Sequence, residues 1–370
     1  MSTISIYASF PKKSLLPRNV ALNDIASWSW LHCLTIPLET PNQYSRHPYK
    51  WLRFCIGSVV GAEGDLSTTT DPSDIVDYDA ALPGESIHLF YHTTPQEKKR
   101  MFPLDPHIDM GRSDTVSKPE YDMVSIEGDA FVDQVENRDR FEGPTLAMSN
   151  KRCNDAVHII PDTKGNEYIR LLTEGRSRDP DGADIIMDIE SIRNGLLMNI
   201  LCHVVFGRQI AILQTPNFAM NSADVDASAA PNEKRWTYHF FKESPDDMNP
   251  TNLPPGSELH MNRDCDPSMN PPAILLDAVY AALILRHFGT EELEDRSLAF
   301  AKDAFYPEGR GYLTEIGRHR AEQRRVRDKR LLLRYEAVEK VRKQIAQIRK
   351  ERETQAGKPD RLDNTLLDLT

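Results

Sequence analysis

The stretches "VHIIPDTKGNEYI" (157–169) and "IESIRNGLLMNILCHVVFG" (189–207) decide how this chain is interpreted. The first places His158 in an apolar run that stops at a proline, a pattern typical of a strand that ends in a turn. The second places Asn194 just before an apolar helical pattern, with His203 near its far end. The carboxamide of Asn194 suits an N-cap, so we expect this helix to begin directly after it.

A lone histidine beside an apolar strand is ordinarily a hydrogen-bonded core residue. The ordered combination of a strand histidine, an asparagine and a helix histidine favours a functional interpretation of His158. Both interpretations stay open on these residues alone.

The chain has 370 residues, of which 39% are hydrophobic and 27% charged, which predicts a globular protein of two or three modest domains. The apolar stretch "AILLDAVYAALIL" from Ala273 is too short to span a bilayer and contains Asp277, and the N-terminus lacks the pattern of a secretory signal. We therefore expect an intracellular protein without a membrane span, nuclear or cytoplasmic. The run "RRVRDKR" from Arg324 is a candidate nuclear address.

Residues 1–125 are predicted to be a β-rich segment. The stretches "WLRFCIGSVV" from Trp51 and "SIHLFYHT" from Ser86 are rich in aromatic and branched residues, which favours strands. His88 and His92 are interpreted as ordinary strand histidines rather than metal ligands, because no acidic or cysteine residue stands at a helpful spacing. The five cysteines include no CxxC pair, which argues against a disulfide framework or a cysteine-rich zinc site.

Residues 126–290 mix helical and strand patterns. A short amphipathic helix is predicted over 129–141, and strands are predicted from Gly207 and from Arg235. Residues 246–272 hold many prolines and indicate a long surface connection. The stretch "PPAILLDAVYAALILRHFG" (271–289) predicts a core helix, since it is apolar nearly all round and is bounded by prolines and a glycine.

Residues 291–370 are predicted to form a charged helical tail. Between Arg318 and Arg352 there are fourteen Lys or Arg against five Asp or Glu, although the whole chain carries a net charge of -11. A narrow apolar seam at 3-4-3 spacing is formed by Val338, Val341, Ile345 and Ile348. One interpretation is a solvated helix that pairs through this seam, as in a homodimer, and the other is a helix that contacts nucleic-acid phosphates.

The motifs "AVHIIPDTKGNEYI" and "RNGLLMNILCHVVFG" resemble those of the HNH nuclease superfamily, in the fungal-type branch with an "AHIIP"-like first motif and an "NGLLL…H"-like second motif. The resemblance covers about residues 128–290, is faint before 125 and is absent from the basic tail. It implies an α+β protein with a ββα-metal core domain, here preceded by the β-rich segment and followed by the basic helix.

The resemblance also implies site residues. His158 matches the general base that takes a proton from the attacking water, and imidazole titrates near enough to neutral pH for this task. Asn194 matches the asparagine that fixes the loop and orients the first histidine. His203 matches the helix histidine that binds a divalent ion, for which Mg²⁺, Zn²⁺ and Ni²⁺ are the candidates.

Two positions depart from the family pattern. Many HNH enzymes carry a metal ligand immediately before the base histidine, where this chain has Val157, and several carry a further helix histidine where it has Gly207. Asp155 is the first candidate for a replacement ligand and Cys153 the second, with a turn or core packing as the alternative for each. The segment "GPTLAMS" from Gly143 also differs from the stretch that usually precedes the first motif.

Two functions follow from these observations. The first is a metal-dependent HNH-type endonuclease that hydrolyses phosphodiester bonds of nucleic acid, in particular DNA, with His158, Asn194 and His203 as catalytic residues and His203 and Asp155 as metal ligands. The alternative is a catalytically inactive HNH-fold module that binds nucleic acid or protein partners. The ligand missing at Val157 and the acidic net charge favour this alternative.

Overall fold

A computed structural model of the chain describes most of residues 2–306. The described residues are 2–12, 15–16, 27–109, 130–139, 154–241, 256–259 and 265–306. The chain divides into two compact units, Met1–Thr314 and Glu315–Thr370. The second unit lies outside the described residues, as do Cys153 and the segment from Gly143, so the basic helix and its apolar seam stay predictions.

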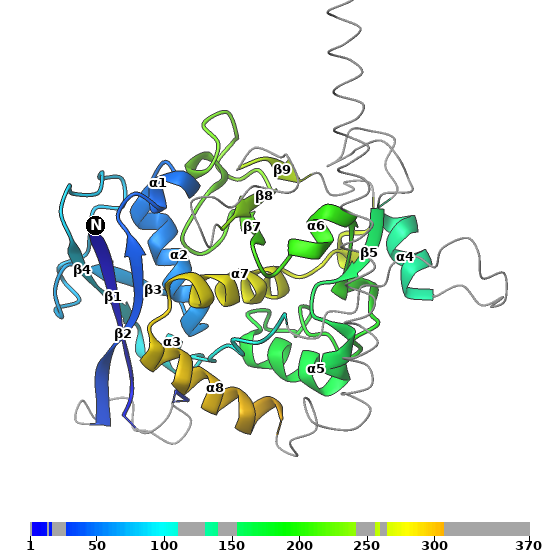
Figure 1. The fold of residues 1–370 in the computed structure, drawn as a ribbon, viewed down its shortest axis with the longest axis horizontal. Coiled ribbons are helices and arrows are strands. Elements are labelled where there is room, and N and C mark those ends of the chain that lie inside the picture. Colours follow the sequence, from blue (N-terminus) through cyan, green and yellow to red (C-terminus); the bar gives the residue numbers. More distant parts are fainter. Residues whose placement is uncertain are drawn as a thin grey trace, which may run out of the picture. The chain divides into compact units, whose positions relative to one another are not determined.

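The N-terminal part is built on a sheet of four strands in the order β2-β1-β4-β3 (Figure 1). Its strands are β1 (Thr3–Pro11), β2 (Trp28–Pro37), β3 (Gly64–Ser67) and β4 (Ile87–Thr93). β1 pairs with β2 in antiparallel and with β4 in parallel orientation, and β3 and β4 are antiparallel. The predicted strand from Ser86, with His88 and His92, is therefore confirmed.

The strand predicted from Trp51 is wrong, because this stretch lies in helix α2 (Pro48–Val60). Pro48 starts the helix with a backbone angle already suited to it, and Gly61 ends it in the left-handed conformation with φ 74°. Burial on nearly all sides explains its aromatic and branched residues, and the indole nitrogen of Trp51 donates to the Tyr280 hydroxyl at 2.7 Å. The N-terminal part also contains two short helices, α1 (Pro41–Tyr44) and α3 (Pro95–Lys98).

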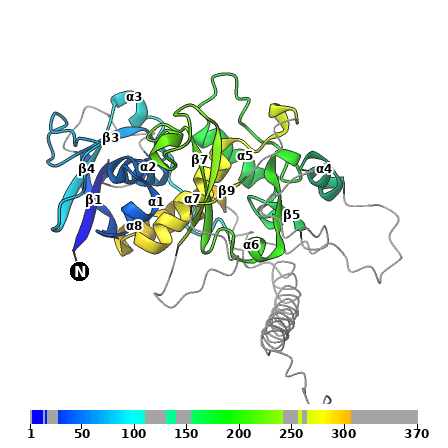
Figure 2. The same cartoon turned by 90° about the horizontal axis from the view of Figure 1, so that it is seen from above.

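The predicted core helix is confirmed as α7 (Ala273–Phe288), with Pro272 at its N-cap and Gly289 at its C-cap. It contacts β2, α2, α5 and β7 (Figure 2), so it needs apolar side chains on every side. A three-stranded sheet, in the order β7-β8-β9, packs beside it. Its strands are β7 (Ile210–Thr215), β8 (Arg235–Phe240) and β9 (Glu258–Leu259), the first two as predicted.

The remaining elements are α4 (Ala130–Arg138), β5 (Asn154–His158), α5 (Gly165–Arg176), β6 (Gly195–Asn199), α6 (Ile200–Val205) and α8 (Glu291–Phe305). Helix α4 confirms the amphipathic helix predicted over 129–141, since Phe131 and Val135 are buried. The fold is mixed α+β, as predicted.

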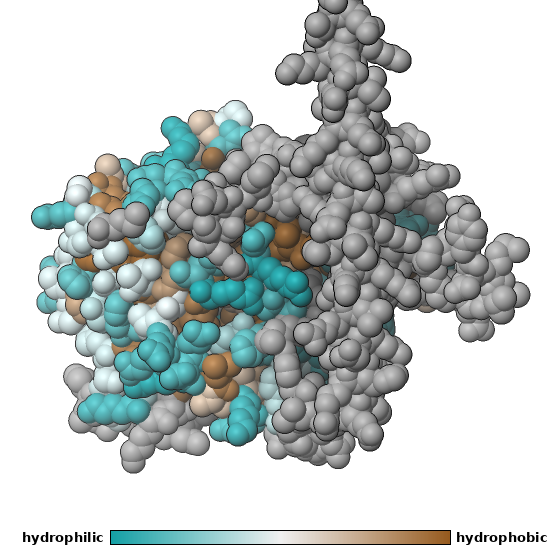
Figure 3. All heavy atoms as spheres, viewed as in Figure 1, coloured by the Kyte–Doolittle hydropathy of each residue, from teal (hydrophilic) through white to brown (hydrophobic). Residues whose placement is uncertain are grey.

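One contiguous core runs from Ile4 on β1 to Phe305 on α8, and a smaller cluster of Phe131, Val135 and Ala156 lies apart from it. Hydrophilic residues dominate the described part of the face seen in Figure 3, with apolar residues scattered between them. The domain boundaries at residues 125 and 290 stay a prediction. By length and composition Pro267–Phe288 could cross a membrane, but 67% of its apolar window is buried within the protein, as in a core helix.

Candidate functional site

The two motifs form an antiparallel strand pair that leads into a short helix. His158 at the end of β5 lies opposite Gly195 at the start of β6, and Asp155 lies opposite Met198. Helix α6 begins directly after β6 and carries His203. The chain between the strands contains α5, so the ββα arrangement encloses a helical insertion (Figure 1).

Asn194 is not an N-cap of the second-motif helix, which corrects the sequence prediction. It ends a short 3₁₀ turn, Ile192–Asn194, and the strand β6 separates it from α6. The helical spacing of the apolar residues is misleading here, because residues 195–199 pair with β5 and the helix starts only at Ile200.

The side chain of Asn194 instead fastens the loop that follows His158. It is 0% exposed, and its Oδ1 accepts from the backbone nitrogen of Ile160 at 2.9 Å. Its Nδ2 donates to the carbonyl oxygens of Ile160 at 2.9 Å and Ile189 at 3.0 Å. The carboxamide thus fixes the backbone two residues after His158.

His158 is held between a ring and a carboxylate. Its imidazole stacks on Phe131 of α4, with ring centroids 3.8 Å apart and planes 5° from parallel. Its Nε2 lies 3.1 Å from Oε2 of Glu190, whose side chain is 51% exposed while that of His158 is 6% exposed. A carboxylate at this distance orients the imidazole and stabilises its protonated form. Sequence reasoning missed Glu190, which lies 32 residues from His158.

His203 meets Asp155 and not His158. The two side chains are each 3% exposed, and Nδ1 of His203 lies 3.5 Å from Oδ2 of Asp155. Side chains on a strand alternate between its faces, so Asp155 and His158, three residues apart, point to opposite faces of the strand pair. The packing of the neighbouring residues supports this alternation. Val157 joins the main core, whereas Ala156 packs with Phe131 in the smaller cluster.

The donors of Asp155 and His203 form a pair rather than a full ligand set. Among the described residues there is no group of three or more His, Cys, Asp or Glu side chains placed to hold a metal ion. Structural and catalytic zinc sites use three or four protein ligands, so this pair does not fit Zn²⁺ by itself. The carboxylate of Asp155 suits Mg²⁺, whereas the imidazole of His203 suits Zn²⁺ or Ni²⁺, and both side chains are 3% exposed.

A buried arginine clamps the loop that carries Asn194. The side chain of Arg138 is 1% exposed and forms a two-pronged ion pair with Asp139 at 2.7 Å. Its guanidinium donates to the carbonyl oxygens of Ile192 and Gly195, both at 2.8 Å, which flank Asn194. Nothing in the sequence pattern marks Arg138 for this task, since Ile192 and Gly195 lie more than 50 residues further along the chain.

The glycine at position 195 allows α4 to approach. A Cβ there would lie 2.4 Å from Cγ2 of Val135 and 2.9 Å from the ring of Phe131, closer than real atoms come. The small residue in "RNGLL" therefore positions the Phe131 ring against His158.

A second buried network fastens the far end of the segment that follows His158, at Lys164. The ammonium group of Lys164 donates to Oδ2 of Asp105 at 3.1 Å and to the carbonyl oxygen of His107 at 2.7 Å. The hydroxyls of Tyr168 and Tyr306 donate to the same Asp105 oxygen at 3.0 and 2.7 Å. Burial lowers the pKa of Lys164, and Asp105 opposes that shift. These contacts make Lys164 a structural residue rather than a reactive amine.

The other candidates have local roles. His92 on β4 forms a hydrogen bond between its Nε2 and the hydroxyl of Ser67 at 2.8 Å, and burial lowers its pKa. His88 on the same strand is exposed. Cys33, Cys55 and Cys202 are buried free thiols, and the thiol of Cys265 donates to Oδ1 of Asn270 at 3.3 Å.

Comparisons of the chain with models of protein families, with curated proteins and with solved structures found no match.

Proposed function

We propose that β5, β6 and α6 form an HNH-type ββα unit that hydrolyses nucleic-acid phosphodiester bonds, in particular those of DNA, with a divalent ion. The observation that carries this proposal is the position of Asn194, whose carboxamide binds both backbone groups of Ile160 just beyond His158. Asn194 is a buried asparagine that fixes the loop after the strand histidine, and the strand pair leads to the helix histidine. This arrangement supports the resemblance of the two motifs to those of HNH nucleases.

His158 acts in this proposal as the general base. An imidazole can accept a proton from water at neutral pH, and the charge it then carries is stabilised by Glu190 at 3.1 Å. Phe131 covers one face of the ring and shields His158 on that side. Glu190 is a positioning residue, and Asn194 and Arg138 hold the backbone on both sides of the site.

Asp155 and His203 are the residues that would hold the ion, with Mg²⁺, Zn²⁺ and Ni²⁺ as candidates, since the carboxylate suits the first and the imidazole the other two. When bound, a divalent ion stabilises the negative charge that develops on the phosphate and the leaving oxygen. The basic segment 318–352 would supply phosphate contacts, because its net charge is positive while that of the whole chain is -11. We propose an intracellular location, nuclear or cytoplasmic.

A second function is favoured by the separation of the candidate residues. His158 lies on one face of the strand pair and the Asp155–His203 pair on the other, and Val157 points into the main core. In this alternative the unit is a catalytically inactive HNH fold that binds nucleic acid or protein partners.

Nicking of supercoiled plasmid by the purified full chain separates the two functions. The reaction is run with Mg²⁺, Mn²⁺, Ni²⁺ or Zn²⁺ and with EDTA, and the double variant Asp155→Asn with His203→Gln serves as the ion-site control. Nicking that needs an ion and is lost in the double variant supports the nuclease. Protein that is folded by circular dichroism, binds the plasmid and leaves it intact with every ion supports the inactive binding module.

A further inference from the structure

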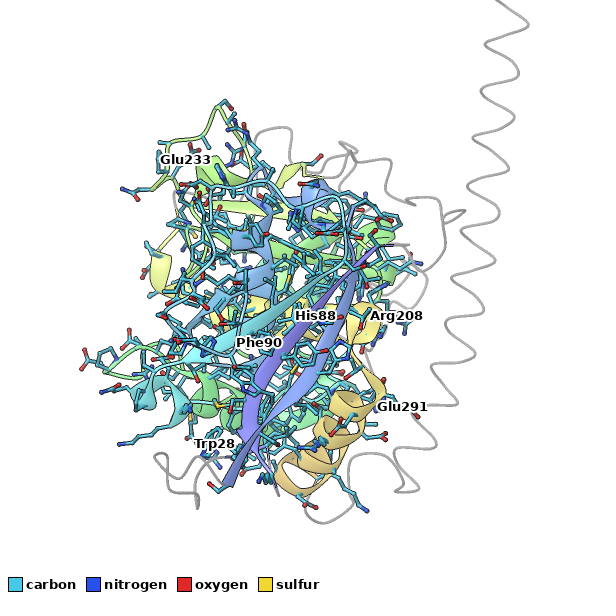
Figure 4. All side chains as sticks on the ribbon, turned by 90° about the vertical axis from the view of Figure 1, so that its left-hand side faces the viewer. Trp28, His88, Phe90, Arg208, Glu233 and Glu291 are labelled. Carbon is cyan, nitrogen blue, oxygen red and sulfur yellow. The ribbon has the colours of Figure 1, made fainter. Side chains whose placement is uncertain are left out.

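The four-stranded sheet has one face that turns away from the core. Along β1, β2 and β4, alternate residues are buried and the residues between them are half-buried or exposed. Figure 4 looks onto this side of the sheet, with Trp28, His88 and Phe90 labelled. We call it the outer aromatic face, and its residues are Ser5, Tyr7, Ser9, Trp30, His32, Thr35, His88, Phe90 and His92. None of these nine residues is Lys, Arg, Asp or Glu, but Asp65 of the edge strand β3 pairs with His92 and forms an ion pair with Arg53 at 3.0 Å.

The rings of this face form a continuous row across three strands. Tyr7 lies between His32 and Phe90, with ring centroids 4.8 and 5.2 Å away and planes within 24° of parallel. Trp30 meets Phe90 edge-on at 5.2 Å and His92 at 5.1 Å. Aromatic side chains are enriched at the centre of protein interfaces.

The row is unsuited to nucleic acid. Bases stack on exposed ring faces, and Tyr7 already has a ring on each side. Nucleic acid also needs Lys or Arg for its phosphates, and the nine positions hold neither.

Acidic residues border the face along one edge. The loop between β3 and β4, residues 68–86, contains five Asp or Glu and no Lys or Arg, and Asp71, Asp74 and Asp77 in it are exposed. The loop runs along β3, because Ile75 bridges to Ser67 and the carbonyl oxygen of Thr69 lies 3.4 Å from Nε2 of His92. Ile75 is itself 52% exposed, so this border offers apolar contact as well as negative charge.

The opposite edge is also acidic. Helix α8 starts against β2. The backbone nitrogen of Thr290 donates to the carbonyl oxygen of Cys33 at 3.0 Å, and the Thr290 hydroxyl donates to the carbonyl oxygen of His32 at 2.6 Å. The first turn of α8 carries Glu291, Glu292 and Glu294, which stabilise the helix N-terminus. Figure 4 shows Glu291 beside the sheet. An aromatic row between two acidic edges is complementary to a cationic partner.

The chain itself places a cation on the end of this row. Trp28 lies two residues before Trp30 on β2, and the ammonium group of Lys98 lies 4.5 Å from the centroid of its ring. An ammonium group over an indole ring is attracted by the negative charge of the ring face.

We propose that the outer aromatic face binds a basic segment of a partner protein. Lys and Arg side chains of that segment pair with the carboxylates of the 68–86 loop and of α8, and its apolar side chains pack on Trp30, Phe90 and Ile75. This binding site lies in the N-terminal sheet and is independent of the proposed nuclease function.

The test is fluorescence anisotropy of a labelled amphipathic peptide of lysine and leucine titrated with the full chain, with a glutamate and leucine peptide as its counterpart. The lysine peptide is expected to bind and the glutamate peptide to fail. Trp30→Ser is expected to weaken binding by about tenfold or more, the usual effect of removing a central aromatic anchor.

Two surface variants keep the test decisive where Trp30→Ser fails to fold. Ile75→Ser and Asp77→Lys change exposed residues, and each is expected to weaken binding several-fold. Their matched controls are Met187→Ser, at another exposed apolar residue, and Asp181→Lys, at another exposed acid. Equal binding by all variants, or no binding of the lysine peptide, overturns the proposal.

Two further outcomes also overturn it. Displacement of the peptide by a single-stranded oligonucleotide whose own binding is weakened by Trp30→Ser would assign the face to nucleic acid. Self-association that Trp30→Ser abolishes, without peptide binding, would assign it to a second copy of the chain.

Discussion

The imidazole of His158 lies flat on the ring of Phe131, with their centroids 3.8 Å apart. This contact joins α4 to the end of β5 and leaves His158 7% exposed. It is the reason why a histidine near the surface is shielded on one side, and it makes Phe131 part of the candidate site.

Replacing Phe131 by alanine is expected to expose His158. The rate at which diethyl pyrocarbonate modifies His158, followed by mass spectrometry, should rise in Phe131→Ala, because one face of the ring loses its cover. His88 is already exposed and serves as the internal control, with the same rate in both proteins. An unchanged rate at His158 would mean that Phe131 does not shield it in solution.

Asn194→Asp is expected to destabilise the protein by about 3 kcal/mol or more. The carboxylate can still accept from Ile160, but it cannot donate to the carbonyl oxygens of Ile160 and Ile189, and it buries a charge. Urea denaturation gives the free energy of unfolding. Asn166→Asp is the matched control. Asn166 is exposed, and its Oδ1 accepts from the backbone nitrogen of Ile189, a bond that an aspartate can keep. Equal effects of the two changes would contradict the fastening role of Asn194.

Arg138→Met is expected to cost about 3–5 kcal/mol, since it leaves Asp139 buried without its partner and removes donors from Ile192 and Gly195. Arg170→Met is the control. Arg170 pairs with Glu167 and Glu174 on the surface of α5, where water screens the charges and such pairs contribute little to stability. Thermal or urea unfolding measures both, and a small loss in Arg138→Met would show that the clamp is dispensable.

Two groups, the buried His239 and the half-buried Asp277, are expected to give opposite pH dependences of stability. Burial lowers the pKa of His239 to about 3, so between pH 3 and 6.5 the unfolded chain binds more protons and stability rises with pH. Burial raises the pKa of Asp277 to about 7, against the opposing effect of Arg176 and Arg178. Between pH 3.8 and 7 the folded chain therefore binds more protons at Asp277, and stability falls as pH rises.

The two slopes offset one another in the wild type between about pH 4 and 6.5, and single variants separate them. In Asp277→Asn the free energy of unfolding is expected to rise with pH by up to about 1.4 kcal/mol per unit. In His239→Phe it is expected to fall over the same range relative to the wild type. Urea denaturation at several pH values checks both, and variants whose profiles parallel the wild type would contradict the assigned shifts.

The sequence predicted those elements whose local pattern and tertiary surroundings agree. The helix at 271–289 is apolar all round, and it lies among β2, α2, α5 and β7, so its composition matches its position. The strands at 210–215 and 235–240 pair with each other, and their branched and aromatic residues suit a sheet.

The errors arose where composition and periodicity pointed to the wrong element. The stretch from Trp51 has strand-like residues because its helix is buried on nearly all sides, although Pro48 and Gly61 mark the ends of that helix. Residues 195–199 have helical spacing, yet pairing with β5 makes them a strand. Local pattern cannot report such pairing, because it depends on residues about 40 positions away.

The candidate site was predicted in part. Asp155 and His203 do lie together, and Asn194 does hold the loop after His158, but His158 is on the other face of the strand pair. Glu190, Phe131 and Arg138 could not be predicted, because each reaches the site through a contact across many residues of chain.

The proposed catalytic role of His158 is tested most directly by the initial rate of plasmid nicking with Mg²⁺ in His158→Ala, compared with the wild type and with His92→Ala. The account predicts a loss of about a hundredfold or more in His158→Ala, the usual contribution of a general base, and an unchanged rate in His92→Ala. Nicking by folded His158→Ala at the wild-type rate would contradict the account and remove His158 from the site.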